Sequence, residues 1–267
     1  MRGIALAGLL TLAPLAVAQP AAAQDSSAAA VSGRFTAPEA AAFGKALEKD
    51  LAVRGARVAL VWRSGRPRKS MPAGLAYTHG ALWIYREVTA ADGRKLKGYA
   101  VYNLYHGDGK SRPRTVSALV QDWPTDFMLG SLEDDVTVIV PTPEMQRRLL
   151  ALVDSPTYAA LHVTSYSLID SPFDRRHQNC NTFMLEVIAA AAWETGDPAQ
   201  IALNLKAWFK PSVIKAGPLQ RLFGPMIDPR LATDDQSGPI VTASYESIAA
   251  FMADNRLSQE TYSFRRP

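Results

Sequence analysis

The chain of 267 residues contains one cysteine, Cys180, so no disulfide within the chain can hold its fold together. Exported domains often rely on disulfides, but a chain of this length can bury a sizeable hydrophobic core. We therefore expect a single domain with a real core. The lone thiol is then a buried inert side chain, an intermolecular link or a functional nucleophile.

The first residues have the pattern of a secretory signal peptide. Arg2 precedes an apolar run from Ile4 to Val17, and small residues follow at 16–18 and 21–23. A single charge, an apolar segment of this length and an A-x-A site are typical of a leader removed on export. Cleavage after Ala18 or Ala23 fits equally well. We take residues 1–23 as the signal peptide, 24–34 as a polar linker and 35–267 as one domain, which predicts a periplasmic or secreted protein.

Composition limits the partners of the mature chain. Its longest apolar run, residues 187–193, is far below the roughly 20 residues of a membrane-spanning helix, so we expect no transmembrane segment. Without Arg2, 28 basic residues stand against 25 acidic ones, a small and scattered excess that does not predict nucleic acid binding. The one basic cluster, residues 63–69, indicates a solvated turn or, less commonly, contact with anionic lipid or glycan.

The hydrophobic pattern predicts an α+β domain. Thr36 and Glu39 form a capping box for a helix that ends near Gly55. We expect strands at 57–63, 77–85, 97–105, 136–140 and 161–169, and further helices at 142–152, 182–193, 198–208 and 244–253. One helix followed by an antiparallel meander, with helices packed on the sheet, is the α+β arrangement.

Cys180 falls at the first position of a predicted helix, directly after Asn179, a good N-cap. Unpaired N–H groups and the positive end of the helix dipole both stabilise a thiolate there. The same N–H groups can receive the oxyanion of a tetrahedral intermediate. Cys180 is therefore either a nucleophile or a small residue tucked under a turn.

A cysteine nucleophile needs an imidazole as base and a polar group to orient it. Of the four histidines, His79 lies in an apolar and aromatic strand, where burial requires a partner. His106 follows a strand as a turn residue, and His162 fits either role. His177 precedes Cys180 by three residues, which hints at metal, but no further ligands complete a zinc set. We predict no metal and no cofactor.

Asn103 lies in the strand expected to pair with the one that bears His79. Its amide could accept from one imidazole nitrogen and fix the tautomer. The alternative is an asparagine on an edge strand that faces solvent.

The segment from Tyr77 through His79 to Leu82 resembles the "His-x-G-I/L" strand of the circularly permuted NlpC-type branch of papain-like proteins. Residues 179–183, Asn-Cys-Asn-Thr-Phe, resemble the "N-C-x-x-F" helix start of lecithin:retinol acyltransferase-like enzymes. Residues 35–255 more narrowly resemble the bacterial domain-of-unknown-function family 2145. That likeness rests on the Tyr77–His79 strand, Val138–Pro141, Tyr166–Leu168, Gln178–Asn181 followed by Leu185 and Glu186, and Asp234 with Asp235.

The resemblance implies a papain-like antiparallel sheet with packed helices, in the permuted order of histidine strand before cysteine helix. It implies Cys180 as nucleophile, His79 as base and Asn103 as the third polar residue, although relatives often have His or Glu at that position. Tyr166 or Gln178 would add a donor near the oxyanion.

Two functions from different classes follow. The first is an exported cysteine-dependent hydrolase or acyltransferase that acts on an amide or ester, in a cell-wall peptide or an acyl lipid. The second is a non-catalytic envelope module that keeps the fold and binds a peptide, glycan or lipid. Thiol redox chemistry is weaker, because no resolving cysteine accompanies Cys180. A sulfur within about 4 Å of a His79 nitrogen in an open cleft would favour the enzyme, and a sealed thiol would favour the module.

Overall fold

The computed structural model describes residues 34–89, 92–217 and 224–267, so the predicted signal peptide and nearly all of the linker lie outside the described residues. The helices are α1 (Ala37–Val53), η1 (Arg68–Ser70, a 3-10 turn), α2 (Pro124–Leu129), α3 (Pro143–Val153), α4 (Pro156–Ala160), α5 (Cys180–Trp193), α6 (Pro198–Trp208) and α8 (Tyr245–Asp254). The strands are β1 (Val58–Arg63), β2 (His79–Thr89), β3 (Lys95–His106), β4 (Ser117–Asp122), β5 (Asp135–Pro141), β6 (Ser212–Ile214), β7 (Ile240–Thr242) and β8 (Ser258–Arg265).

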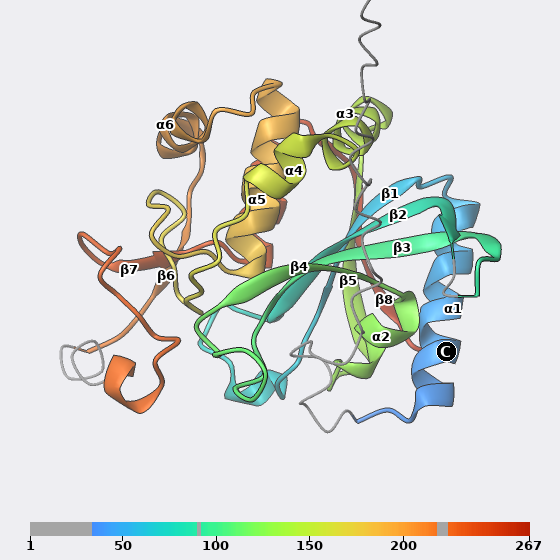
Figure 1. Cartoon of the computed structure of the whole chain (residues 1–267), viewed down its shortest axis with the longest axis horizontal. Coiled ribbons are helices and arrows are strands. Elements are labelled where there is room, and N and C mark those ends of the chain that lie inside the picture. Colours follow the sequence, from blue (N-terminus) through green and yellow to red (C-terminus); the bar gives the residue numbers. More distant parts are fainter. Residues whose placement is uncertain (1–33, 90–91, 218–223) are drawn as a thin grey trace, which may run out of the picture.

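A six-stranded antiparallel sheet in the order β4-β3-β2-β1-β5-β8 organises the molecule (Figure 1). In its centre β1 pairs with β2, so that Arg63 lies opposite His79 and Trp62 lies opposite Gly80. The ladder between β2 and β3 ends at Leu82 and Tyr102. The predicted α+β class with an antiparallel sheet and packed helices is confirmed.

Helices cover both faces of this sheet (Figure 1). On one face α1 and α2 pack against alternate residues of the central strands. This first cluster includes Phe43, Leu47, Leu51, Phe127 and Met128 from the helices, and Ala59, Val61, Ala81, Trp83, Val101, Val136 and Val138 from the sheet. Successive residues of a strand point to opposite faces of the sheet. The strand residues that alternate with those of this cluster therefore pack on the other face.

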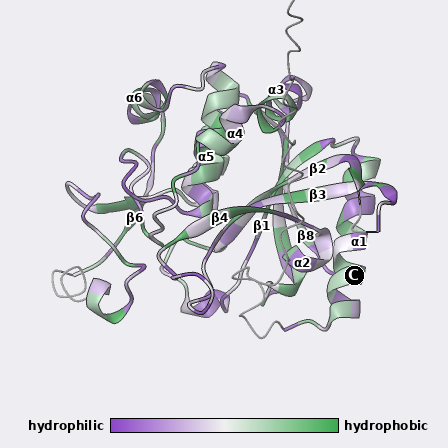
Figure 2. Ribbon diagram, in the orientation of Figure 1, coloured by the Kyte–Doolittle hydropathy of each residue, from purple (hydrophilic) through white to green (hydrophobic). Residues whose placement is uncertain are grey.

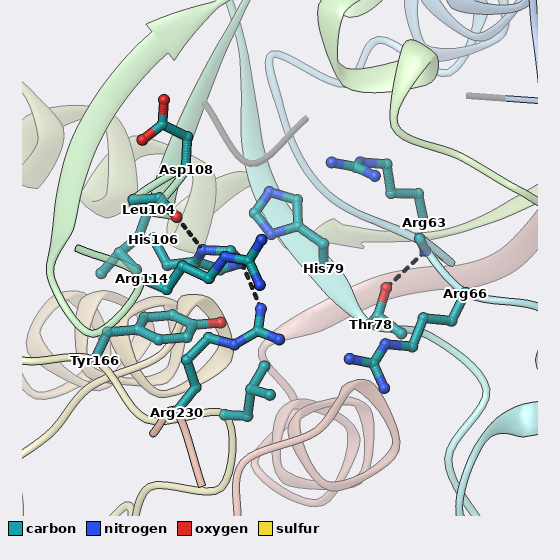
Figure 3. A pocket seen from close by; sticks show the side chains of 13 residues that line it. Arg63, Arg66, Thr78, His79, Leu104, His106, Asp108, Arg114, Tyr166 and Arg230 are labelled. Atoms are coloured by element: carbon teal, nitrogen blue, oxygen red, sulfur yellow. Dashed lines mark hydrogen bonds between the residues drawn. The ribbon is translucent and has the colours of Figure 1, made fainter. Parts of the chain in front are cut away.

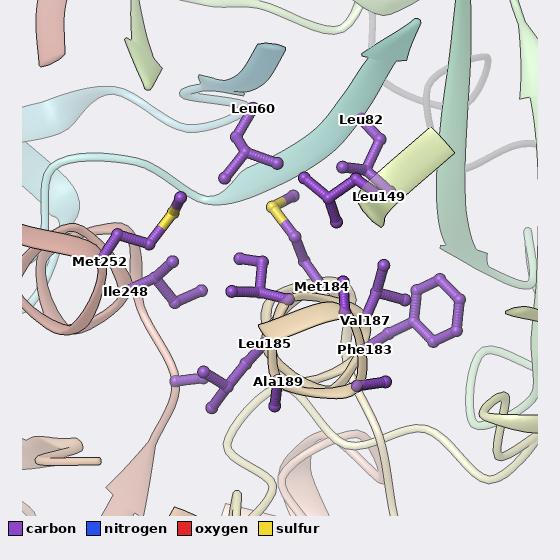
Figure 4. Packing of buried hydrophobic residues seen from close by; sticks show 14 of the residues in the cluster. Leu60, Leu82, Leu149, Phe183, Met184, Leu185, Val187, Ala189, Ile248 and Met252 are labelled. Atoms are coloured by element: carbon purple, nitrogen blue, oxygen red, sulfur yellow. The ribbon is translucent and has the colours of Figure 1, made fainter. Parts of the chain in front are cut away.

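The second face packs against α5, with α3 and α8 beside it. Figure 4 shows Leu60 and Leu82 of the sheet above Met184 and Val187 of α5. Residues 180–191 of α5 are all buried, and Figure 2 shows the hydrophobic colour along this helix. Each fully buried aliphatic side chain contributes about 1.5–3 kcal/mol, so this helix anchors one half of the core.

Local sequence explains the helix boundaries. Thr36 and Glu39 form both bonds of the predicted capping box at α1, and the helix ends before Gly55, whose φ is 65°. Asn179 caps α5 and Ser244 caps α8, as predicted from the sequence. These short-range signals need no tertiary contact, which is why they could be recognised in the sequence.

The predicted strand at 161–169 was wrong. The segment forms a single bridge, between Ser165 and Val116, and its other backbone groups bond to unrelated partners. Val163 N–H donates to the Gln178 side chain, and Leu168 N–H donates to the carbonyl of Arg230. The segment is thus a connection pinned by loops and side chains, although its β-branched and aromatic composition is typical of a strand.

The sequence pattern did not predict β4, α2, the edge strand β8 or the two-stranded sheet of β6 and β7. None of the helices that the structure describes has the length and apolarity needed to cross a bilayer.

Candidate functional site

Cys180 is the first residue of α5, as predicted, and Asn179 is its N-cap. The Asn179 side-chain oxygen accepts from the N–H of Asn181 at 2.8 Å and from that of Thr182 at 3.0 Å. The cap therefore occupies two of the N–H groups that were expected to serve an oxyanion, and the N–H of Cys180 itself is left for that role.

Gly80 allows the start of α5 to approach β2 closely. A Cβ at this position would lie 2.7 Å from the Met184 terminal methyl group and would also overlap the Trp62 indole nitrogen. Trp62 in turn donates to the Asn181 side chain at 2.8 Å and joins β1 to the first turn of the helix. The helix start is thus held directly against the beginning of β2.

The thiol of Cys180 is enclosed and has main-chain partners. The residue is 5% exposed, and its sulfur donates to the carbonyl of Thr78 at 3.9 Å. Burial raises the pKa of Cys180 to about 11, although the Gly80 N–H beside the sulfur works in the opposite direction. Asp170, also fully buried near the helix start, adds to the rise. The thiol is therefore held neutral, whereas the helix start alone predicted a thiolate.

His79 belongs to a network of polar side chains. Its Nε2 lies 3.0 Å from Asn103 Oδ1, and Asn103 Nδ2 donates to Asp122 at 2.8 Å. Tyr105 donates to the other Asp122 oxygen at 3.1 Å, and its ring stacks on the His79 imidazole with centroids 4.8 Å apart. Because the Asn103 amide nitrogen is spent on donation, its oxygen accepts, and His79 Nε2 carries the proton. Nδ1 is then the unprotonated nitrogen.

Burial sets the protonation of this network. It lowers the pKa of His79 to about 3, and the neighbouring Arg63 guanidinium adds to the fall. It raises the pKa of Asp122 to about 8, with a further contribution from Asp126. At neutral pH the imidazole is uncharged and Asp122 holds a proton for a large part of the time.

Cys180 and His79 lie against opposite faces of β2. His79 contacts Phe127 of α2, at 5.8 Å between ring centroids, and Phe127 belongs to the first face. Cys180 belongs to the cluster of the second face and touches the main chain on either side of His79. No hydrogen bond joins the two side chains in the described structure. His79 and Asn103 are therefore brought together as the sequence analysis expected, whereas the thiol and the imidazole do not form a bonded pair.

A pocket of about 250 Å³ opens where β1, β2 and β3 end (Figure 3). Its wall includes His79 and Tyr166 but not Cys180, and it carries six basic side chains against one acidic side chain, Asp108. The basic residues are Arg63, Arg66, His79, His106, Arg114 and Arg230. Figure 3 shows the guanidinium groups of Arg114 and Arg230 and the hydroxyl of Tyr166 turned toward the same space.

The two predicted donors differ in position. Tyr166 is buried at its ring but lines the pocket, and burial raises the pKa of its hydroxyl well above the ordinary value, with Cys180 nearby as a further cause. Gln178 is fully buried, accepts from Val163 N–H and donates to Leu161 and Glu186. Gln178 therefore holds the segment before α5 and has no donor left for a ligand.

The remaining histidines have local partners. His106 Nδ1 donates to the Gly107 carbonyl at 2.7 Å, His162 meets Ser117, and His177 bonds to Ser165 and Asp234. Among the described residues no group of three His, Cys, Asp or Glu side chains could hold a metal ion. Asp122, Arg114 and Arg230 were not predicted from the sequence, because only the folded chain brings them to His79 and the pocket.

Fold and site together define an α+β protein with a cationic pocket at one end of an antiparallel sheet. The chain belongs to the family DUF2145, described as an uncharacterized protein conserved in bacteria, which it matches over residues 50–252. No curated protein and no solved structure matched the chain.

Proposed function

We propose that this protein is a ligand-binding module whose site is the pocket at the end of the sheet. The observation that carries this proposal is the separation of the thiol from that pocket. Cys180 is 5% exposed, bonds to main chain and lies outside the wall, whereas His79 and Tyr166 line it. A ligand in the pocket would meet basic side chains and a tyrosine hydroxyl, which are recognition groups. The proposal includes export of the protein to the periplasm or out of the cell, and a ligand from the cell envelope.

A second candidate, the cysteine-dependent hydrolase or acyltransferase, is favoured by one specific observation. His79 Nε2 is fixed by Asn103, and Asn103 by Asp122, which is the support that a catalytic imidazole receives from an orienting residue. The Gly80 N–H and the start of α5 also lie at the sulfur. Hydrogen bonds at catalytic sites can be long before substrate binds, so a rearrangement of His79 toward Cys180 would be needed.

In this second candidate the Cys180 sulfur would attack a carbonyl carbon while its proton passes to His79 Nδ1. The tetrahedral adduct would collapse as the imidazolium returns that proton to the departing amine or alcohol. Water, or another acceptor, would then cleave the thioester and regenerate the thiol. A papain-like fold in the circularly permuted order is part of this second candidate.

The pH dependence of Cys180 alkylation separates the two. Iodoacetamide labelling is measured over a range of pH in the original chain and in His79→Ala, with denatured chain as the fully accessible reference. The binding module predicts slow labelling with a profile shifted to high pH and no dependence on His79. Rapid labelling well below the free-thiol pKa of about 8.5, lost in His79→Ala, would overturn the proposal and establish the enzyme.

A further inference from the structure

We infer that the pocket binds a phosphoryl group, and that Arg66 and Arg114 are the residues that hold it. This inference deepens the proposed function and rests on it for the location of the site. The charged groups that line the pocket differ in whether another group of the protein already neutralises them.

Arg230, His106 and Asp108 are occupied. Arg230 forms a two-pronged ion pair with Asp228, at 3.0 and 2.6 Å, and its remaining nitrogen points to His106 Nε2 at 3.3 Å. His106 is thereby fixed with its proton on Nδ1, which donates to a carbonyl. The carboxylate of Asp108 accepts from the N–H groups of Lys110 and Ser111 within its own turn. His106 is therefore neutral, and none of these three groups needs a ligand.

Arg66 and Arg114 are in a different state. Both side chains are exposed and line the pocket, and neither makes a hydrogen bond or ion pair with any described residue. Arg114 lies near enough to Asp228 to help lower the pKa of that carboxyl, but Asp228 is already paired with Arg230. Most other arginines of this chain, among them Arg54, Arg86, Arg176 and Arg266, bond to a carboxylate. Figure 3 shows Arg66 and Arg114 approaching the pocket from different walls.

Arg63 adds a buried positive charge behind the pocket. It is 4% exposed, donates to the Gly130 carbonyl and lies over the Phe127 ring, and its Nε has no partner in the described structure. No carboxylate forms an ion pair with it among the described residues. Asp122 is close enough to feel the charge of Arg63, but burial keeps this carboxyl protonated for a large part of the time. An anion in the pocket would therefore supply the counter-charge that a buried cation needs.

The arrangement favours a phosphoryl group over a carboxylate. One arginine can bind a planar carboxylate through two parallel hydrogen bonds, so two arginines on different walls exceed its needs. A tetrahedral phosphoryl group presents oxygens in several directions and can be shared by Arg66, Arg114 and the Tyr166 hydroxyl. A pocket of about 250 Å³ is large enough for such a group with a small attached alcohol, but not for a whole lipid.

Isothermal titration calorimetry of the full chain tests this inference. The probes are inorganic phosphate, glycerol 3-phosphate and a short-chain phosphatidic acid below its micelle concentration, with acetate as the carboxylate comparison. Arg66→Gln and Arg114→Gln remove the two unpaired charges. Arg94→Gln is the matched control, because Arg94 is exposed, pairs with Asp92 and lies at the far end of the β2–β3 hairpin.

We expect the phosphate probes to bind, and each pocket variant to weaken binding about tenfold while Arg94→Gln leaves it unchanged. Raising the salt concentration should weaken binding as well. Equal affinity for all phosphate probes identifies the free anion or any monoester, and binding of phosphatidic acid alone identifies a lipid headgroup. Both support the phosphoryl site.

Three results would overturn the inference: no phosphate probe binds, acetate binds as tightly as phosphate, or Arg66→Gln and Arg114→Gln bind normally. Alkylation of Cys180 tests the proposed function separately. A reactive, His79-coupled thiol in a chain that still binds phosphate through Arg66 and Arg114 would remove the binding module and keep the phosphoryl site. An inert thiol in a chain that binds no phosphate would remove the phosphoryl site and keep the binding module.

Discussion

At the start of β2, the two faces of the strand place two titratable groups, Cys180 and His79, in different surroundings. On the α5 side, Cys180 has apolar neighbours and main-chain partners. On the α2 side, His79 begins a chain of hydrogen bonds through Asn103 to Asp122. Both groups are held neutral by burial, but only the imidazole is oriented by other side chains and reaches the pocket.

This difference shows how far a helix start can activate a thiol. The dipole and N–H groups at a helix N-terminus stabilise an anion by about 0.3–1 kcal/mol, and up to about 2 kcal/mol in favourable sites. Burial of a charge in an apolar core costs several kcal/mol. At Cys180 burial is the larger effect, and the pKa rises although the sulfur lies at the start of α5.

Among the substitutions that test this comparison, we expect the largest loss of stability at the contact between β2 and α5. Gly80→Ala would place a methyl group against Met184 and Trp62, where there is no space. We expect the free energy of unfolding to fall by about 2–3 kcal/mol, the usual cost of overpacking. Urea denaturation measures it. Gly98→Ala on the neighbouring strand is the control, because its Cβ would meet Glu48 at an ordinary 3.5 Å.

If Gly80→Ala and Gly98→Ala unfold at the same urea concentration, the close approach of α5 does not depend on the glycine. The start of the helix would then be free to shift, and the separation of Cys180 from His79 would be less firmly fixed than the packing indicates.

The polar side of the comparison is tested by Asn103→Leu. This change leaves His79 and Asp122 without their shared partner, in a site where Asn103 is 1% exposed. An unsatisfied buried polar group costs about 1–3 kcal/mol, so we expect a loss near 2 kcal/mol in urea denaturation. In a double-mutant cycle with Asp122→Leu the two effects should not add, since they disrupt one network. Strict additivity would contradict a coupled network.

The fold was predictable where its signals are short-range. The caps at Thr36, Asn179 and Ser244 and the strands β1, β2 and β3 follow from capping residues and from runs of apolar and β-branched side chains. β8 is an edge strand of mixed composition, with exposed residues alternating along it. Its pairing with β5 joins distant parts of the sequence, and no local pattern specifies such a pairing.

The candidate site was predictable in part. His79 and Asn103 lie on consecutive antiparallel strands, which could be predicted from the sequence. The ladder between these strands stops at Leu82 and Tyr102, so the contact of the two residues is made by their side chains beyond it. The face of the sheet on which Cys180 lies depends on how α5 packs. Because successive strand residues point to opposite faces, a contact one residue further along β2 places the thiol on the face opposite to His79. The pocket gathers Arg66, Arg114 and Arg230 from three loops, and their meeting is a property of the folded chain alone.

The pH dependence of stability distinguishes the two sides further. Asp122 has its pKa raised from 3.8 to about 8, so the folded protein keeps a proton that the unfolded chain loses. Stability from this group is therefore highest below about pH 4 and falls as pH rises toward 8. Each pKa unit corresponds to about 1.4 kcal/mol.

Asp122→Asn should remove this part of the pH dependence, because the amide keeps a donor and an acceptor but does not ionise. We expect the variant to gain more than about 1.4 kcal/mol relative to the original chain between about pH 5 and about pH 8. Urea denaturation at both pH values measures the change. Glu186, whose pKa is raised to about 7, contributes equally in both proteins and cancels. Parallel pH profiles would mean that Asp122 is ionised in the folded state.

The smallest effect is expected at the thiol. Cys180→Ala removes one buried sulfur and a weak bond to Thr78, for about 1 kcal/mol of unfolding free energy. Because the sulfur lies outside the pocket wall, the affinity for inorganic phosphate should be unchanged, whereas His79→Ala, which alters the wall, should change it. Calorimetry of both variants makes the comparison direct. Equal losses of affinity in the two would place sulfur and imidazole in one site, and the separation across β2 would no longer describe how the protein works.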